Sequence, residues 1–419
     1  MKTGQIHWPS VLQFVLTGLV ILNLWGGAAI LAMIGISGLM IGGVRDSSFT
    51  DPLPLFLMAA VMAATGFLLL PSGYYALWRA LGWQALDFRP FLAKLQPALW
   101  ILILPVVLLL GYGASNSSGF AWLLLPPFHL LAVSLPVGWI LFLSVRGLPL
   151  GSPQRMWGVL SSGLILAPAL ILILEGIAGL VFLLFVAVSI TSHPDLVKEL
   201  TRLVDWISAA NPSPEAVVEA VKPFVMRPGV IFSILAFGAI VVPLIEEAIK
   251  PMGVWLLAGR KISPAAGFAA GAMSGAGYAL FESLVLVGDG QQWVSLVVAR
   301  IGTAAIHIFT SGLTGWALVQ VWHKRRYGLL GASYLIAVLI HGLWNALTLV
   351  FSFTAMAGLQ SMEFQIPYFF ELGQVAPFGL VFLALGAFSG LLWANRSLRI
   401  KDERSKDISS QRERKESVL

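Results

Sequence analysis

The sequence contains no cysteine and few charged residues. Asp, Glu, Lys and Arg together make up 11% of its 419 residues. The lack of cysteine excludes disulfides, a cysteine nucleophile, a thiolate metal site and S-acylation. The scarcity of charge excludes a typical water-soluble surface, since soluble domains carry about 25% charged residues. With 58% hydrophobic residues and a mean hydropathy of +0.86, the chain is predicted to be a polytopic membrane protein.

Long apolar runs fill most of the chain. A helix needs about 20 apolar residues to cross a bilayer. The runs expected to do so cover residues 11–43, 53–77, 96–113, 119–145, 156–191, 229–258, 264–287, 293–322, 329–355 and 374–395. The predicted fold is therefore an all-α polytopic transmembrane helix bundle of about ten spans. The first run lacks a small-residue cleavage site, so it is interpreted as a span and not as a signal peptide.

Basic residues are unevenly distributed between alternate connections. Nineteen of the 26 Lys and Arg residues fall on one side of the ten-span arrangement, and eight of these lie in the tail from Arg396. Cytoplasmic loops carry such an excess, so both termini are predicted to be cytoplasmic in a multi-pass protein of the cell membrane. The net charge of +6 does not indicate a nucleic-acid partner, because the basic residues collect in short loops and the tail.

Five regions follow from this arrangement. Residues 1–191 form a five-span region of unknown role, and 229–355 form a membrane core that is richer in polar groups. Between them, 192–228 is predicted to be an extracytoplasmic amphipathic segment, with one helix broken at 211–214 and a second helix from Pro214 to Val225. Residues 356–395 hold the last loop and final span. The charged tail at 396–419 is expected to be cytoplasmic and disordered.

The stretch PLIEEAIKP at 243–251 places two adjacent carboxylates and an amine inside a predicted span. Ionisable groups in membrane spans are costly and usually mark a functional site. Most of those in this chain lie in the 229–355 core, whereas His129 and Glu175 are isolated in the first half and are interpreted as structural. The polar residues of the core are Glu246, Glu247, Lys250, Glu282, Arg300, His307, His341 and Asn345.

Helical spacing relates these residues to one another. Lys250 follows Glu246 by four positions and Glu247 by three, so it can reach either carboxylate. Glu282 and Arg300 are expected to lie further toward the outside, as a pair. On the predicted helix at 264–287, Gly267, Gly271 and Gly275 form a row of small residues that lets a neighbouring helix approach closely. Ser274, Tyr278 and Glu282 lie on an adjacent face.

Several chemistries fit this set. A buried glutamate can act as a general base toward water. His307 and His341 could bind a metal together with Glu247, because two histidines and a carboxylate form a known catalytic zinc set. In a metal-free alternative, a histidine and Asn345 stabilise an oxyanion while Glu247 activates water. A buried ion-pair network that only holds the helices together also fits the spacing.

Four motifs in order resemble those of the PrsW family of intramembrane proteases, which is related to CAAX-prenyl proteases and bacteriocin-processing enzymes. They read EEAIK at 246–250, GYALFES at 277–283, RIGTAAIHIFTSGLTGWAL at 300–318 and HGLWNAL at 341–347. The resemblance covers 229–355. It departs at Ser283, where the family commonly has Asn, and at Asn345, where many members have Asp. It implies catalytic roles for Glu246, Glu247, Glu282, His307 and His341, supported by Lys250, Arg300 and Asn345.

The resemblance implies a peptidase that cuts a membrane-protein substrate within or near its span. Glu247 is the preferred base, and a divalent metal such as zinc is one option for its cofactor. No HExxH motif occurs, and Asp289 falls in a loop without a partner aspartate in a span, so other intramembrane protease types fit less well. The alternative function is a proton- or ion-coupled transporter that uses the same buried cluster. A non-catalytic scaffold is a third, and the oligomeric state is left open.

Overall fold

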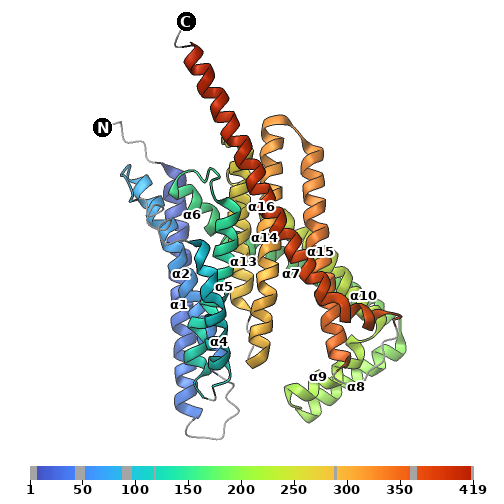
Figure 1. The fold of residues 1–419 in the computed structure, drawn as a ribbon. Coiled ribbons are helices and arrows are strands. Elements are labelled where there is room, and N and C mark those ends of the chain that lie inside the picture. Colours follow the sequence, from blue (N-terminus) through green and yellow to red (C-terminus); the bar gives the residue numbers. More distant parts are fainter. Residues whose placement is uncertain are drawn as a thin grey trace. The chain divides into compact units, whose positions relative to one another are not determined.

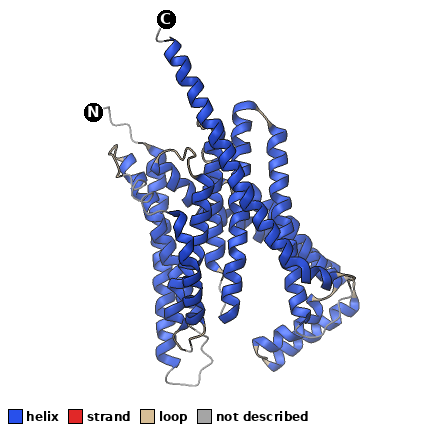
Figure 2. Cartoon of the chain, in the orientation of Figure 1, coloured by secondary structure: helices blue, strands red, loops and turns tan. Residues whose placement is uncertain are grey.

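The computed structural model describes residues 7–42, 52–86, 97–117, 119–286, 290–358 and 366–416 (Figure 1). Helices account for all the regular secondary structure of these residues, which include no strand (Figure 2). The predicted all-α class is therefore confirmed.

Eight helical segments in the described residues are long and apolar enough to cross a membrane. Each coincides with one of the ten predicted runs. They are α1 (Trp8–Gly42), α2 (Leu53–Ala80), α5 (Ala121–Val145), the series α6 (Pro153–Ser161), η2 (Ser162–Leu166) and α7 (Ala167–Thr191), the series α10 (Pro228–Ala236), η3 (Phe237–Val241), α11 (Val242–Ile249) and α12 (Met252–Trp255), then α14 (Gly290–Lys324), α15 (Tyr327–Gly358) and α16 (Phe369–Glu416).

The two other predicted runs are also helical, but they do not reach both the length and the hydropathy of a helix that crosses a membrane. Residues 96–113 correspond to the 3₁₀ helix η1 (Pro97–Ile103) and the short helix α4 (Leu104–Ser115). Residues 264–287 correspond to α13 (Pro264–Val285), which is long enough but so rich in Gly and Ala that its hydropathy is low. The protein is thus a polytopic helical membrane protein, and the orientation of its termini stays a prediction.

The chain divides into two compact units. The first contains Met1–Pro168, Lys250–Tyr334 and Ala384–Leu419. Within it, α13 is buried along most of its length and contacts α14, α5, α6, η2 and α12. This unit has two clusters of buried apolar side chains, one around Val254, Met273 and Leu318 and one around Leu125 and Trp293.

Glycines make the close contact between α13 and α14 possible. A Cβ atom added to Gly271 would lie 2.1 Å from the carbonyl oxygen of Ser311, and one added to Gly275 would lie 2.3 Å from that of His307. The predicted row of small residues therefore allows close helix packing, as expected. It also explains the low hydropathy of α13, because Gly replaces the larger apolar residues that most spans use.

The second unit contains Ala169–Ile249 and Leu335–Leu383. It includes α8 (Pro194–Ala210) and α9 (Pro214–Val225), which confirm the two helices predicted for the 192–228 segment. Asn211 ends α8 in a left-handed conformation (φ 42°), and Ser213 caps α9 by accepting a hydrogen bond from the Ala216 N–H. The half-buried positions of α8 form one apolar stripe: Leu196, Leu200, Leu203 and Ile207.

The disorder predicted for the tail is wrong for its described part, because α16 continues to Glu416. Residues 396–416 contain no Gly or Pro, and they mix acidic and basic residues at helical spacing. Both features favour a helix even without a core to pack against.

We expect Gly271→Ala to destabilise the protein by about 1–3 kcal/mol, because the added methyl group overpacks the α13–α14 contact. Gly138 on α5 is the matched control, since a Cβ atom there meets nothing within 4 Å. Gly138→Ala should be neutral or slightly stabilising, because Ala is the better helix former. Thermal unfolding of the two purified variants in one detergent checks this, and equal melting temperatures would contradict the packing argument.

Candidate active site

The EEAIK stretch lies at the end of a helix. Glu246 and Glu247 occupy the last turn of α11, which ends at Ile249, and both are buried, with 6% and 0% of their surface exposed. Pro251 has no N–H group and cannot continue the helix, so the chain turns after Lys250 before α12 begins. Adjacent helical residues point about 100° apart, which directs the two carboxylates to different neighbours.

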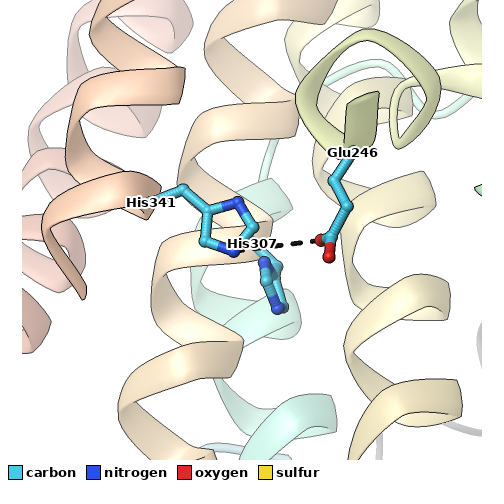
Figure 3. Close-up of side chains that lie close together, drawn as sticks. All are labelled: Glu246, His307 and His341. Carbon is cyan, nitrogen blue, oxygen red and sulfur yellow. Dashed lines mark ion pairs between the residues drawn. The ribbon is translucent and has the colours of Figure 1, made fainter. Parts of the chain in front are cut away.

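In the second unit, His341 on α15 faces both carboxylates. Its Nδ1 lies 3.0 Å from Oε1 of Glu247, and its Nε2 lies 3.9 Å from Oε2 of Glu246 (Figure 3 draws the second pair). A carboxylate only accepts, so the Nδ1–H group donates to Glu247. When the ring is neutral, Nε2 then carries the lone pair, and it is this atom that faces Glu246. A carboxylate that holds one ring nitrogen in this way fixes the orientation of the other for binding or catalysis.

Asn345, one turn beyond His341, holds α15 against the segment that precedes α11. Its Nδ2 donates to the carbonyl oxygen of Gly238 in the π-helical η3, at 2.9 Å. A Cβ atom on Gly342 would lie 2.3 Å from the carbonyl oxygen of Ala239, so the two backbones approach closely here. This contact gives Asn345 a packing role in addition to the supporting role implied by the resemblance.

In the first unit, four ionisable side chains form a continuous row. The Nζ of Lys250 lies 2.8 Å from Nδ1 of His307, and Nε2 of His307 lies 2.7 Å from Oε2 of Glu282. The same Glu282 oxygen lies 2.6 Å from Nη2 of Arg300, whose Nε donates to Oγ of Ser283 at 3.1 Å. The predicted Glu282–Arg300 pair is confirmed.

Glu282 is the most exposed member of this row. Lys250 and His307 are fully buried, whereas the Glu282 side chain keeps 31% of its surface exposed. Sequence spacing related Lys250 only to the two glutamates before it. Its partner His307 lies 57 positions away on α14, and no local pattern in the sequence points to that contact.

The contacts of His307 restrict its use as a metal ligand. As an ammonium group, Lys250 carries donors only, so Nδ1 of His307 would accept and the Nε2–H group would donate to Glu282. Neither ring nitrogen then has a lone pair left for a metal unless Lys250 moves. Within the second unit, Glu246 and His341 are buried and carry donor types that suit a metal. The sequence placed Glu247 in this set, whereas its Oε1 is held by His341.

Two buried residues of α13 belong to the surroundings of Lys250 and had no role in the sequence prediction. Ser274 donates to the carbonyl oxygen of Lys250 at 2.6 Å and accepts from the Gly253 N–H at 3.1 Å. The ring of Tyr278 lies 4.8 Å from the Lys250 ammonium. Their spacing with Glu282 placed them on one helix face, but only the structure shows what that face contacts.

His129 has the structural role predicted for it. It is fully buried in α5, where Nδ1 accepts a hydrogen bond from Nε1 of Trp293 at 3.1 Å. Its Nε2 lies 3.1 Å from the carbonyl oxygen of Leu284, to which it donates. His129 therefore links α5 to both α13 and α14.

Comparison with known proteins assigns the chain to a family. The family described as PrsW family intramembrane metalloprotease matches residues 154–372, which is more than half of the chain. The match includes all the proposed site residues and extends beyond the predicted 229–355 core in both directions. No curated protein and no solved structure matches the chain. The chain therefore belongs to the PrsW family of intramembrane proteases and is a peptide-bond hydrolase.

Proposed function

We propose that this protein cuts a membrane-protein substrate within or near its span, using water activated by the Glu246, Glu247 and His341 cluster. The observation that carries the proposal is the contact of Glu247 with Nδ1 of His341, which directs Nε2 toward Glu246. This arrangement supplies a buried carboxylate and a positioned imidazole nitrogen within one unit of the protein. The transporter alternative has no support from the family match.

The contacts favour Glu246 as the general base, whereas the sequence analysis favours Glu247. Glu247 is engaged with His341, so its main effect is to orient the ring. Oε2 of Glu246 lies 3.9 Å from Nε2, which is too long for a direct hydrogen bond. A water molecule placed between these atoms could donate to both. Glu246 would take the proton of the attacking water and later deliver it to the leaving amine.

Lys250 and His307, which the sequence resemblance includes among the catalytic and supporting residues, form a pair within the first unit. Only two residues separate Glu247 from Lys250 in the chain, so covalent continuity keeps their Cα atoms within about 11 Å. The Lys250 side chain is fully buried with its Nζ 2.8 Å from Nδ1 of His307, and its ammonium form would place a positive charge there. Positive charge near the scissile carbonyl would stabilise the oxyanion that forms when water attacks. Glu282 and Arg300 would hold His307 from its other side.

A divalent metal such as zinc would be held by Glu246 and His341, with Glu247 orienting the histidine. When bound, the metal would supply Lewis-acid polarisation of the water and of the carbonyl oxygen. The donor types fit such an ion, since zinc binds imidazole nitrogens and carboxylate oxygens.

We also propose that both termini are cytoplasmic and that 192–228 lies outside, as the basic residues indicate. The apolar stripe of α8 then rests at the membrane surface. Topology reporters inserted between α8 and α9 would test this orientation, and a cytoplasmic signal there would contradict it.

The function is tested first by a comparison of membrane proteomes. Strains carry the wild type, a deletion, Glu246→Gln, Glu247→Gln or the control Glu175→Gln, all expressed at equal level. One or a few membrane proteins should accumulate uncut in the deletion and Glu246→Gln strains but not in the Glu175→Gln strain. If no membrane protein changes length while Glu246→Gln is folded and abundant, the proteolytic function is contradicted.

The same strains separate the roles of the two glutamates. On the identified substrate, Glu246→Gln should lower the cleavage rate by about 10²–10⁴-fold, as expected for loss of a general base. Glu247→Gln can still accept from Nδ1 of His341, so we expect a smaller loss of about 10–100-fold. The opposite ranking would identify Glu247 as the base.

Removing the competing ammonium should strengthen metal binding. We expect Lys250→Met to raise the affinity for Co²⁺ or Zn²⁺ at least 10-fold, because Nδ1 of His307 becomes available. Calorimetric titration and the absorption spectrum of bound Co²⁺ measure this without any substrate. His307→Gln in the Lys250→Met background should remove this gain. An unchanged affinity for the metal in Lys250→Met would show that Lys250 does not keep the metal from the Nδ1 lone pair of His307.

A further inference from the structure

One face of α13 contacts Lys250 and His307 at three successive levels. Ser274, Tyr278 and Glu282 are spaced four residues apart, so their side chains project from one face of the helix. Each contacts a different part of the Lys250–His307 pair, and all five residues belong to the first unit. Glu282 belongs to the site already described, whereas Ser274 and Tyr278 have no assigned role.

Ser274 holds the backbone where the helix breaks. The Val254 N–H bonds to the carbonyl oxygen of Pro251 at 2.7 Å, so it is not directed to Lys250 as it would be in a continuous α-helix. The hydroxyl of Ser274 donates to the Lys250 carbonyl and accepts from the Gly253 N–H. Ser274 is fully buried, so bulk water does not reach these backbone groups from its side. One hydroxyl therefore fixes the residue from which the Lys250 side chain projects.

Tyr278 supports both members of the pair. Its ring centroid lies 4.8 Å from Nζ of Lys250, within the range of a cation–π contact. The same ring meets the imidazole of His307 edge to face, with centroids 5.2 Å apart and planes at 87°. Tyr278 is buried, which strengthens a cation–π contact. The ring thus limits the movement of the ammonium and of the imidazole together.

We propose that Ser274 and Tyr278 are positioning residues that hold Lys250 on Nδ1 of His307 and so fix His307 as the Nε2–H tautomer. Ser274 places the backbone of Lys250, Tyr278 places its ammonium, and Glu282 accepts the Nε2–H from the far side. The inference deepens the proposed function, because an imidazole with one defined tautomer presents the same donor and acceptor in every catalytic cycle. Its test does not depend on cleavage.

The test is solid-state ¹⁵N NMR of histidine-labelled full-length protein in lipid bilayers. The chain has six histidines, and comparison with His307→Gln assigns the signals of His307. The wild type should show one protonated Nε2 and one hydrogen-bonded, unprotonated Nδ1. Lys250→Met, Ser274→Ala and Tyr278→Leu should each lose the hydrogen-bonded Nδ1 signal or give a mixture of tautomers.

Two matched controls separate positioning from folding. Ser144 is a buried serine of the same unit whose hydroxyl donates to Ile140 within its own helix, so Ser144→Ala should leave the His307 signals unchanged. Tyr278→Phe keeps the ring and should also leave them unchanged. If Ser274→Ala fails to fold, Tyr278→Leu and Tyr278→Phe still decide the matter.

Two results would overturn the proposal. One is a wild-type His307 protonated on Nδ1. The other is that every folded variant among Ser274→Ala and Tyr278→Leu keeps the wild-type signals although Lys250→Met changes them. The result is independent of the peptidase proposal, since the His307 signals are recorded without substrate and would be the same if no membrane protein were cut.

Discussion

The contact between Glu247 and His341 is the interaction on which the rest of the proposed site depends. Glu247 is completely buried, and a carboxylate in that position is costly unless it is paired. His341 supplies the partner at 3.0 Å and is oriented by the same contact. The position of Nε2 relative to Glu246 follows from that orientation. A single pairing therefore stabilises a buried charge and prepares the second ring nitrogen for chemistry.

The surrounding helices are adapted to hold these groups. Pro251 ends the helix directly after the charged motif, and Ser274 bonds the backbone groups at that break. The glycines of α13 let α14 approach, and α14 carries His307. Asn345 links α15 to the π-helical turn before α11 through its hydrogen bond to the carbonyl oxygen of Gly238. These features require small or polar residues at positions where larger apolar residues would raise the hydropathy of the helices. The close packing and hydrogen bonds around the site are therefore accompanied by a lower hydropathy of these helices.

Much of this organisation can be predicted from the sequence, because hydrophobic runs and helical spacing are local properties. The spans, the two helices at 192–228, the glycine row and the Glu282–Arg300 pair follow from such patterns. The contact of Lys250 with His307 does not, since it depends on how α14 packs near the turn after α11. The roles of Ser274 and Tyr278 depend on the same packing. The tail was mispredicted because its composition resembles disordered segments, although its charge spacing favours a helix.

The most direct test of this account is a double-mutant cycle between Glu247 and His341, measured as cleavage rates of the substrate that the proteome comparison identifies. Residues that act as one unit lose their function together, so the effects of single changes do not add. We predict that Glu247→Ala combined with His341→Ala is no slower than the slower of the two single variants. Losses that multiply would show that the two residues act independently, and this would contradict the central claim.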